Sequence, residues 1–278
     1  MVKLESATST DPGRERSANQ DQVWAQIYQP SDGEPVGLFI VCDGVGGSHG
    51  GEYASHWAME AIKADFDDLF CPSNPRQTVL LPREGLEDGP TGQENTRVSQ
   101  VRKLEMMVRN SVQNANRVVY EYAKKKPDLA ENAGTTVTMA VVMGNRAVIA
   151  NVGDSRTYLL RGNKIRQVTQ DHSLVAKLVA SKQIKPEEVY SHPQRNLIFR
   201  SLGQKDEIQV DTFAELLRSG DILLLCSDGL WEMLPDGKQI QHLVGTSKDP
   251  REACQLLVDA ANEAGGQDNI GVVVVEVQ

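Results

Sequence analysis

Four aspartates stand in glycine-rich, sharply turning segments that follow or interrupt apolar runs. The segments are Cys42-Asp43-Gly44-Val45-Gly46-Gly47, Val152-Gly153-Asp154-Ser155-Arg156, Cys226-Ser227-Asp228-Gly229-Leu230 and Gly265-Gly266-Gln267-Asp268-Asn269. A single Asp-Gly step is typical of an ordinary turn, but four such segments in one chain indicate a shared purpose. Carboxylates gathered at one end of a sheet repel one another unless a cation lies among them, so the pattern predicts a metal site.

The predicted cation is hard and bound through oxygen. Mg²⁺ and Mn²⁺ prefer carboxylate, carbonyl and water oxygens, and the glycine after Asp43 lets the backbone approach closely, so that the Gly44 carbonyl can be a ligand. Too few His and Cys residues lie nearby for a zinc site. A pair of such cations makes bound water acidic and holds the attacking and leaving oxygens of an in-line displacement. The chemistry indicated is hydrolysis of a phosphate ester without a covalent intermediate.

Residues 16–21, with the sequence Arg-Ser-Ala-Asn-Gln-Asp, add two groups suited to this chemistry. Asp21 is a fifth carboxylate, and the planar guanidinium of Arg16 matches the geometry of phosphate oxygens. The alternative is a solvated turn, and this segment alone does not decide between the two.

Composition and charge narrow the class of protein. The chain has 278 residues, of which 40% are hydrophobic and 24% charged, as in a folded protein. A net charge of −9 disfavours nucleic-acid and membrane-surface partners. The four cysteines are far apart, and no apolar stretch reaches the roughly 18 residues of a membrane span. We expect a reduced, cytoplasmic protein that binds neither nucleic acid nor membrane.

Apolar periodicity predicts the elements that position these residues. Segments rich in β-branched residues predict strands at 36–42, 135–143, 147–152, 222–226 and 270–277. Helical spacing predicts helices at 52–70, 98–122, 173–184 and 250–264. Residues 71–96, with several prolines and no sustained period, predict an exposed or partly disordered loop insertion. Because strands and helices are grouped rather than alternating, the pattern favours one α+β domain over 1–278, with antiparallel sheets and helices outside them.

Seven motifs, taken in order, resemble the metal-dependent protein phosphatase family, type 2C, in its bacterial form. They are Arg-x-x-Asn-x-Asp from residue 16, Asp-Gly-x-Gly-Gly from 43, Gly-Thr-Thr from 134, Val-Gly-Asp-Ser-Arg from 152, Thr-x-Asp-His-Ser from 169, Ser-Asp-Gly-Leu-Trp from 227 and Asp-Asn-Ile from 268. The resemblance covers residues 16–275. It implies a four-layer α-β-β-α sandwich of two antiparallel sheets flanked by helices, and hydrolysis of phosphoserine and phosphothreonine in proteins.

The resemblance also implies two or three Mn²⁺ or Mg²⁺ ions per chain and a role for each acidic residue. Asp43 would bridge two cations, and Asp228 and Asp268 would complete the first site. The carbonyl of Gly44, with waters near Asp21, would serve the second site.

A third, weaker cation site would lie between Asp154 and Asp228, and Arg16 would bind the substrate phosphate. The implied catalytic set is Arg16, Asp43 and Asp228. A hydroxide bridging the cations would attack phosphorus directly, so no side-chain nucleophile is needed.

The general acid is left open by the resemblance. Some relatives have a histidine two residues after the bridging Asp, where this chain has Val45, and other bacterial relatives have one directly after the double glycine, where it has Ser48. His49 or a metal-bound water would then protonate the leaving oxygen. His49 as an ordinary exposed loop residue is the alternative, and it is left out of the catalytic set.

Residues 173–202 resemble the bacterial flap beside the active site, which leads to the hypothesis that this segment selects among substrates. Asp171 or Ser173 is expected to cap the helix that follows. Structural rather than chemical roles are expected for His172, Trp231, Thr135 and Thr136.

Two other functions stay open. A catalytically silent relative could bind a signalling partner, although such proteins usually lose metal-binding aspartates that this chain retains. The chain could also be the dedicated phosphatase of one partner-switching regulator, although we expect no sensor module, receiver domain or membrane anchor beside the domain. The expected partners are phosphorylated proteins and a cognate Ser/Thr kinase, with the chain acting as a monomer.

Overall fold

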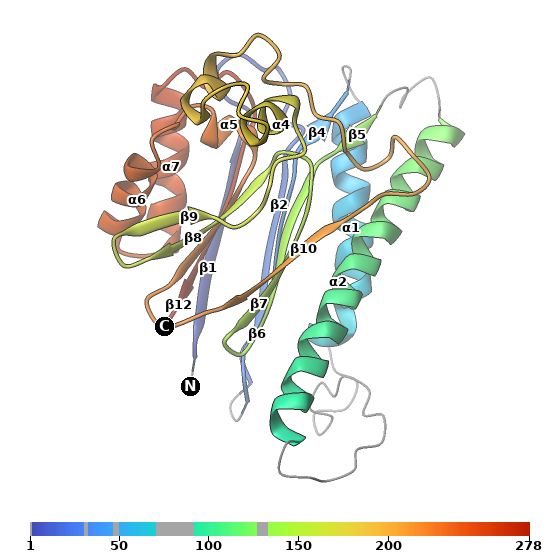
Figure 1. The fold of residues 1–278 in the computed structure, drawn as a ribbon, viewed down its shortest axis with the longest axis vertical. Coiled ribbons are helices and arrows are strands. Elements are labelled where there is room, and N and C mark those ends of the chain that lie inside the picture. Colours follow the sequence, from blue (N-terminus) through green and yellow to red (C-terminus); the bar gives the residue numbers. More distant parts are fainter. Residues whose placement is uncertain (1, 31–32, 47–49, 71–91, 127–132) are drawn as a thin grey trace.

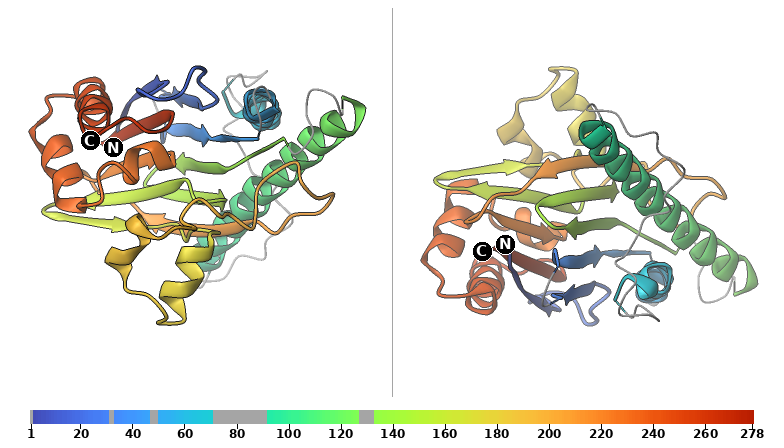
Figure 2. Two further views of the ribbon diagram at one scale, coloured as in Figure 1. Left: turned by 90° about the horizontal axis from the view of Figure 1, so that it is seen from above. Right: turned by 90° about the horizontal axis from the view of Figure 1, so that it is seen from below.

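The computed structural model describes residues 2–30, 33–46, 50–70, 92–126 and 133–278, with the backbone alone described for 68 and 92–99. Two five-stranded sheets pack face to face, and helices cover the outer face of each (Figures 1 and 2). Every strand pair in the two sheets is antiparallel. The predicted four-layer α-β-β-α sandwich is confirmed.

The first sheet contains both the N-terminal and the C-terminal strand. Its order is β1 (Leu4–Asp11), β12 (Ile270–Val277), β11 (Ile222–Cys226), β8 (Arg156–Arg161) and β9 (Lys164–Gln167). Its outer face packs on α6 (Gly237–Thr246) and α7 (Pro250–Glu263), while the one-turn helix α5 (Asp228–Trp231) follows β11. Asp236 and Asp249 accept backbone N–H groups at the starts of α6 and α7, as N-cap residues do.

The second sheet lies against the two longest helices. Its order is β10 (Asp211–Leu216), β7 (Arg146–Val152), β6 (Val137–Met143), β3 (Val36–Cys42) and β2 (Gln22–Tyr28). The helices on its outer face are α1 (Gly50–Phe70) and α2 (Gly92–Lys125). A short ribbon pairs β4 (Gly44–Val45), which follows the end of β3, with β5 (Gly134–Thr135), which precedes the start of β6.

Central strands are apolar on both faces because each lies between two layers. In β3, Leu38 and Ile40 contact the helices, whereas Phe39 and Val41 point between the sheets. Since side chains alternate along a strand, a strand covered on both sides reads as a continuous apolar run. This explains why the runs at 36–42, 222–226 and 270–277 were predictable with their observed bounds.

The four predicted helices are present with shifted ends, whereas α6 was not predicted. The helix predicted at 98–122 extends over Gly92–Lys125, so residues 92–96 are helical and the prediction of a loop there was wrong. Gln93, Glu94 and Arg97 are good helix formers, which favours continuation of the helix. The rest of the predicted insertion, 71–91, lies outside the described residues. None of the helices in the described part of the chain combines the length and apolar character of a membrane span.

The segment 173–202, here called the flap, contains two short helical elements, α4 (Leu174–Ala180) and the 3₁₀ helix η1 (Pro186–Ser191). Ser173 caps α4, because its hydroxyl accepts the N–H of Ala176 at 3.3 Å.

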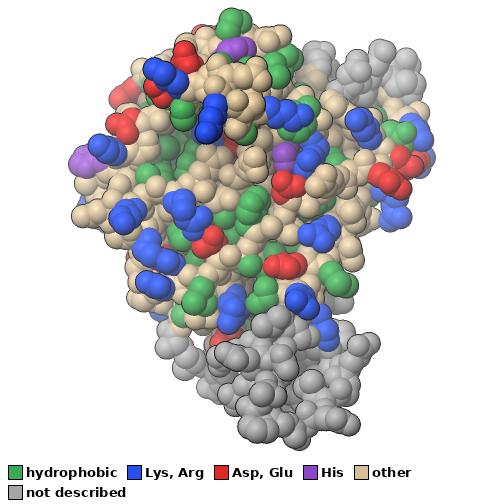
Figure 3. Space-filling view, in the orientation of Figure 1, with side chains coloured by type: hydrophobic (Ala, Val, Ile, Leu, Met, Phe, Trp, Pro, Cys, Tyr) green, Lys and Arg blue, Asp and Glu red, His purple; other side chains and the backbone are tan. Residues whose placement is uncertain are grey.

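On the face of the molecule drawn in Figure 3, Lys and Arg side chains are interspersed with Asp and Glu side chains.

Candidate active site

Strand register brings three aspartates to one end of the second sheet. Asp43 directly follows β3, Asp21 directly precedes β2, and Asp154 lies two residues after β7. The end of β3 pairs with the start of β2, with Cys42 opposite Gln22. The start of β6 likewise pairs with the ends of both β3 and β7. The three carboxylates therefore belong to the same edge.

The first sheet contributes two aspartates at the edge that meets this one. Asp228 begins α5 after β11, and Asp268 lies just before β12. Cys226, at the end of β11, pairs with Val272 near the start of β12 and with Arg156 at the start of β8. Because Arg156 follows Asp154 by two residues, the two edges adjoin. All five predicted aspartates thus lie at one end of the sandwich.

The backbone of Asp43 is fixed by Thr135 of β5 and by Thr136, the residue that follows β5. The Asp43 carbonyl accepts the N–H of Thr136 and the hydroxyl of Thr135, both at 2.8 Å. The Asp43 N–H donates to Thr136 Oγ1 at 3.2 Å. At Gly44, a Cβ would collide with the backbone carbonyls of Gly51 and Gln20. The prediction that the threonines orient backbone near the site is confirmed.

Asp21 is buried with one of its oxygens unpaired. The residue is only 2% exposed. The hydroxyl of Ser227 donates to Oδ2 at 2.6 Å. Oδ1 has no hydrogen-bond partner among the described residues. Burial raises the pKa of Asp21 to about 7, against the lowering effect of the Ser227 hydrogen bond. A buried acceptor without a donor is costly unless a cation or water satisfies it.

The other carboxyls of this group, of which Asp43 and Asp228 are partly exposed, also resist ionisation. Burial, followed by the charges of Asp228 and Asp21, raises the pKa of Asp43 well above its ordinary value. Burial, followed by the charge of Asp154, raises the pKa of Asp228 in the same direction. Burial raises the pKa of Asp154 to about 7, with the charge of Asp171 adding to the effect. A group of carboxyls that raise one another's pKa values is stabilised by any cation that enters among them.

Arg16 lies beside this group and is paired with one of its members. Its Nη2 donates to Asp268 Oδ2 at 2.6 Å, and the two side chains are 55% and 35% exposed. The hydrogen bond and charge of Asp268 raise the pKa of Arg16, and the charges of Asp228 and Asp43 add to this. Both residues line an open cleft of about 290 Å³, which Arg195 and Asn196 of the flap also line.

The donor set fits hard divalent cations in kind, burial and charge. Five carboxylates gather from strand ends, one buried oxygen lacks a partner, and a glycine directly follows Asp43. Among the described residues, no three Asp, Glu, His or Cys side chains are arranged closely enough to hold one ion. The assignment of individual ligands therefore stays a prediction.

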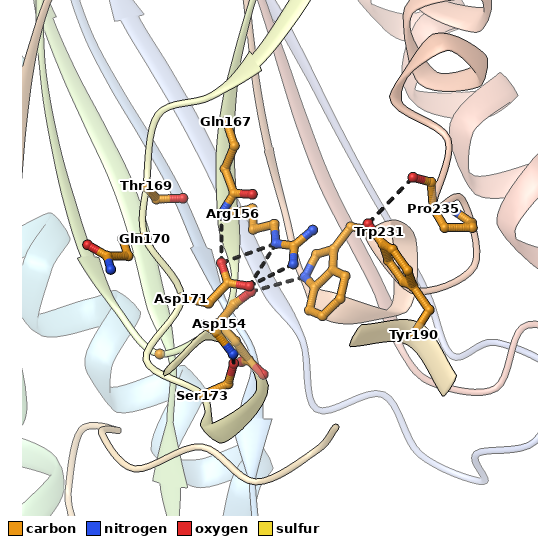
Figure 4. A network of polar contacts seen from close by, with 12 residues as sticks. Asp154, Arg156, Gln167, Thr169, Gln170, Asp171, Ser173, Tyr190, Trp231 and Pro235 are labelled. Atoms are coloured by element: carbon orange, nitrogen blue, oxygen red, sulfur yellow. Dashed lines mark hydrogen bonds and ion pairs between the residues drawn. The ribbon is translucent and has the colours of Figure 1, made fainter. Parts of the chain in front are cut away.

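A buried polar network lies beside Asp154 (Figure 4). Arg156 binds the Asp171 carboxylate through Nε and Nη2, the shorter contact being 2.7 Å. Trp231 covers the guanidinium at 3.5 Å and donates from Nε1 to the Asp154 carbonyl at 3.0 Å. Trp231 is a core residue, as predicted, but it also holds backbone at the site. Asp171 pairs with Arg156 instead of capping α4.

Three supporting residues were not singled out from the sequence. Asn269 accepts the N–H of Gln20 at 2.8 Å and donates to the Ala18 carbonyl at 2.9 Å, so it fixes the loop between Arg16 and Asp21. Ser227 bonds Asp21, and Arg195 reaches the cleft from the flap. One sign of their importance was present in the sequence, because Asn269 and Ser227 stand next to predicted ligands inside the family motifs. Their hydrogen-bond partners are over 200 residues away in the chain, and no local sequence pattern identifies those partners. His49 lies outside the described residues.

Comparison with known proteins gives the same class. Residues 14–177 match the family model for protein phosphatase 2C, and residues 184–278 match that for stage II sporulation protein E. The serine/threonine phosphatase stp of Listeria welshimeri is 34% identical over 267 residues, covering 96% of this chain and 93% of that protein. Protein phosphatase PhpP of Streptococcus pneumoniae is 33% identical, with 98% and 97% covered.

Solved structures agree with this similarity. The catalytic domain of the serine threonine protein phosphatase PstP, in complex with two manganese ions, superposes with a TM-score of 0.77 at 30% identity, covering 100% of this chain and 99% of that one. The serine/threonine phosphatase of S. agalactiae gives a TM-score of 0.78 at 31% identity, with 99% and 100% covered. This chain belongs to the protein phosphatase 2C family, in its bacterial form, and the predicted resemblance is confirmed.

Proposed function

We propose that this protein is a metal-dependent serine/threonine protein phosphatase whose reaction takes place in the cleft beside Arg16. The observation that supports this most strongly is the gathering of Asp21, Asp43, Asp154, Asp228 and Asp268 at one end of the sandwich, next to an exposed guanidinium. Family membership gives the same reaction class, and the related PstP structure contains two manganese ions.

The proposed ligands divide among two or three Mn²⁺ or Mg²⁺ ions. Asp43 is shared between two sites, Asp228 and Asp268 complete the first, and the Gly44 carbonyl serves the second with waters near Asp21. A third site uses Asp154 together with Asp228. When bound, the cations supply water acidic enough to attack phosphorus near neutral pH. The hydrogen bonds from Thr135 and Thr136 keep the Asp43 backbone in place during this step.

Arg16 is the proposed phosphate-binding residue. Its guanidinium is exposed, lies at the cleft and already holds a carboxylate, whose two oxygens resemble two oxygens of a phosphate. In the enzyme with cations bound, Asp268 is a metal ligand, and the guanidinium is then available to the substrate. The proton for the leaving serine or threonine oxygen comes from His49 or from a water, as predicted.

The flap is proposed to select among protein substrates. Arg195 Nε is 3.2 Å from Glu232 and its Nη2 is 3.3 Å from Gln267, so the flap is tied across the cleft. Leu197 and Phe199 are 51% and 42% exposed on it. Exchanging residues 173–202 for the flap of a relative should change the relative rates on different phosphopeptides. Unchanged relative rates on these phosphopeptides would refute this role.

Further expectations concern the cellular location, the partner kinase and the oligomeric state of the enzyme. Cys42, Cys226 and Cys254 are free and buried, which supports a reducing, cytoplasmic location. A cognate kinase and a monomeric state follow from the predicted family role. Light scattering after size-exclusion chromatography tests the monomer, and phosphoproteomics of a deletion strain tests the substrates.

The decisive assay is hydrolysis of para-nitrophenyl phosphate and a phosphothreonine peptide with Mn²⁺ or Mg²⁺, with EDTA as the control. Asp228→Asn should reduce turnover by more than about 100-fold, because a carboxylate that two cation sites share loses its charge. Asp259→Asn, at an exposed position on α7, is the matched control and should be unaffected. Activity that persists in EDTA would contradict the proposal.

A further inference from the structure

His172 forms two hydrogen bonds with Gly153, in the turn that leads into Asp154. Its side chain is 4% exposed, and Nδ1 accepts the N–H of Gly153 at 3.0 Å. Its backbone N–H donates to the Gly153 carbonyl at 2.9 Å. Gly153 has a φ of 107°, and a Cβ there would collide with Thr136. The turn before Asp154 thus has a conformation that favours glycine, and one residue binds it on both of its polar groups.

The same histidine stands at the base of the flap. Its carbonyl accepts the N–H of Phe199 at 2.9 Å, and the N–H of Leu174 donates to the Leu197 carbonyl at 2.8 Å. Ser173 and Ile198 form a β-bridge between these contacts. The two ends of the flap are therefore held together at His172.

The imidazole has a defined tautomer. Because Nδ1 accepts a hydrogen bond, Nε2 carries the proton and donates to Asp211 Oδ2 at 3.1 Å. Arg200 Nη1, also 2.9 Å from Nε2, donates to Asp211 Oδ1 at 2.8 Å. Burial lowers the pKa of His172, which agrees with a neutral ring. The bond to Gly153 and the bond to Asp211 therefore use different ring atoms and can be removed separately.

A second set of contacts joins the flap to Asp154 from the opposite side. Trp231 donates to the Asp154 carbonyl, and Tyr190 of the flap lies edge-on to the Trp231 ring with centroids 6.2 Å apart (Figure 4). Trp231 and Asp228 lie on the same helical turn, α5. The backbone on both sides of the Asp154 carboxylate is thus bonded to residues that contact the flap.

We propose that His172 is a positioning residue that couples the flap to the cation site containing Asp154. The inference rests on the proposed function, because it requires a divalent cation at Asp154. Occupation of that site fixes the Gly153–Asp154 turn, and the fixed turn holds His172 and the base of the flap. Coupling of this kind is reciprocal, so an ordered flap strengthens cation binding by the same factor.

Two substitutions separate the two bonds of the ring. In His172→Asn the amide oxygen can replace Nδ1 as acceptor for Gly153, whereas in His172→Gln the amide nitrogen can replace Nε2 as donor to Asp211. Mn²⁺ binding to EDTA-treated protein is measured by calorimetry. His172→Gln should weaken the weakest Mn²⁺ site roughly fivefold, the factor for loss of one ordinary hydrogen bond, and His172→Asn should stay near wild type. Equal effects of the two variants would overturn the assignment.

A measurement on the wild type makes the test independent of how well the variants fold. Amide hydrogen exchange at Leu174 and Phe199 should slow when Mn²⁺ is added, because both N–H groups donate within the base of the flap. Unchanged exchange in protein shown by calorimetry to bind Mn²⁺ would refute the coupling and leave the proposed function intact. A wild type that bound no Mn²⁺ would overturn both.

Discussion

Replacing Asp171 by Asn tests how far the site depends on the ion pair beside it. Arg156 and Asp171 are 8% and 6% exposed, and their shortest contact is 2.7 Å. Asn keeps the size of the side chain but removes its charge and one acceptor oxygen. The guanidinium would then be a buried charge without its counter-ion, held by the Tyr158 hydroxyl at 3.0 Å and the face of Trp231.

The expected loss is large because the uncompensated charge stays inside. Breaking a buried pair by removing one partner costs about 3–5 kcal/mol. Since Tyr158 and Trp231 remain as partners of Arg156, we expect the lower end, about 3 kcal/mol. Replacing both partners, with Arg156→Met and Asp171→Leu together, should cost less than Asp171→Asn, because no charge is left without water or a counter-ion.

The assay is urea unfolding in EDTA, followed by tryptophan fluorescence and far-UV circular dichroism. The midpoint should fall at an unchanged m value, which marks a change in stability alone. Arg166→Gln, in the pair with Glu215 where Arg166 is 54% exposed, is the control and should cost about 1 kcal/mol or less. A loss below about 1 kcal/mol for Asp171→Asn, or a double variant less stable than the single one, would refute the reasoning.

Two further predictions concern charge at the site. Because burial raises the pKa of Asp154 to about 7, from about 4 in an unfolded chain, its contribution to stability in EDTA is lost as the pH rises from about 4 to 7. The stability of Asp154→Asn relative to wild type should therefore increase over this range in urea titrations, and a constant difference would contradict the shift. Arg16→Ala should raise KM for para-nitrophenyl phosphate by about 10-fold or more with a smaller change in kcat. Arg251→Ala, at an exposed position on α7, should match wild type, and a pure kcat loss at Arg16 would contradict phosphate binding.

Most central strands were predictable because both of their faces are covered, but β8, although buried over most of its length, was not predicted. Edge strands were not, since β1 and β2 consist largely of half-exposed side chains and include several polar residues. Strand β9 has the same partly exposed character. Such strands are stabilised by the neighbour with which they pair, and the local sequence of the strand does not show which segment that neighbour is.

The gathering of the five aspartates at one end of the sandwich was predictable because the proposed chemistry constrains their neighbours in the chain. Asp43 and Asp228 must follow strands closely, and the adjoining glycines permit the required turns. The supporting contacts of Asn269, Ser227 and His172 depend on segments that meet only after folding. The sequence indicated that His172 is structural, but it could not indicate that the ring binds Gly153 beside a predicted ligand.

The central claim is that aspartates distant in sequence hold divalent cations at one end of the sandwich. Anomalous diffraction at the manganese edge, from crystals of the wild type grown with Mn²⁺, tests this most directly. We predict peaks in contact with the carboxylates of Asp43, Asp228 and Asp268, with Arg16 released from Asp268. Peaks found only elsewhere on the protein, with the Arg16–Asp268 pair intact, would contradict the account.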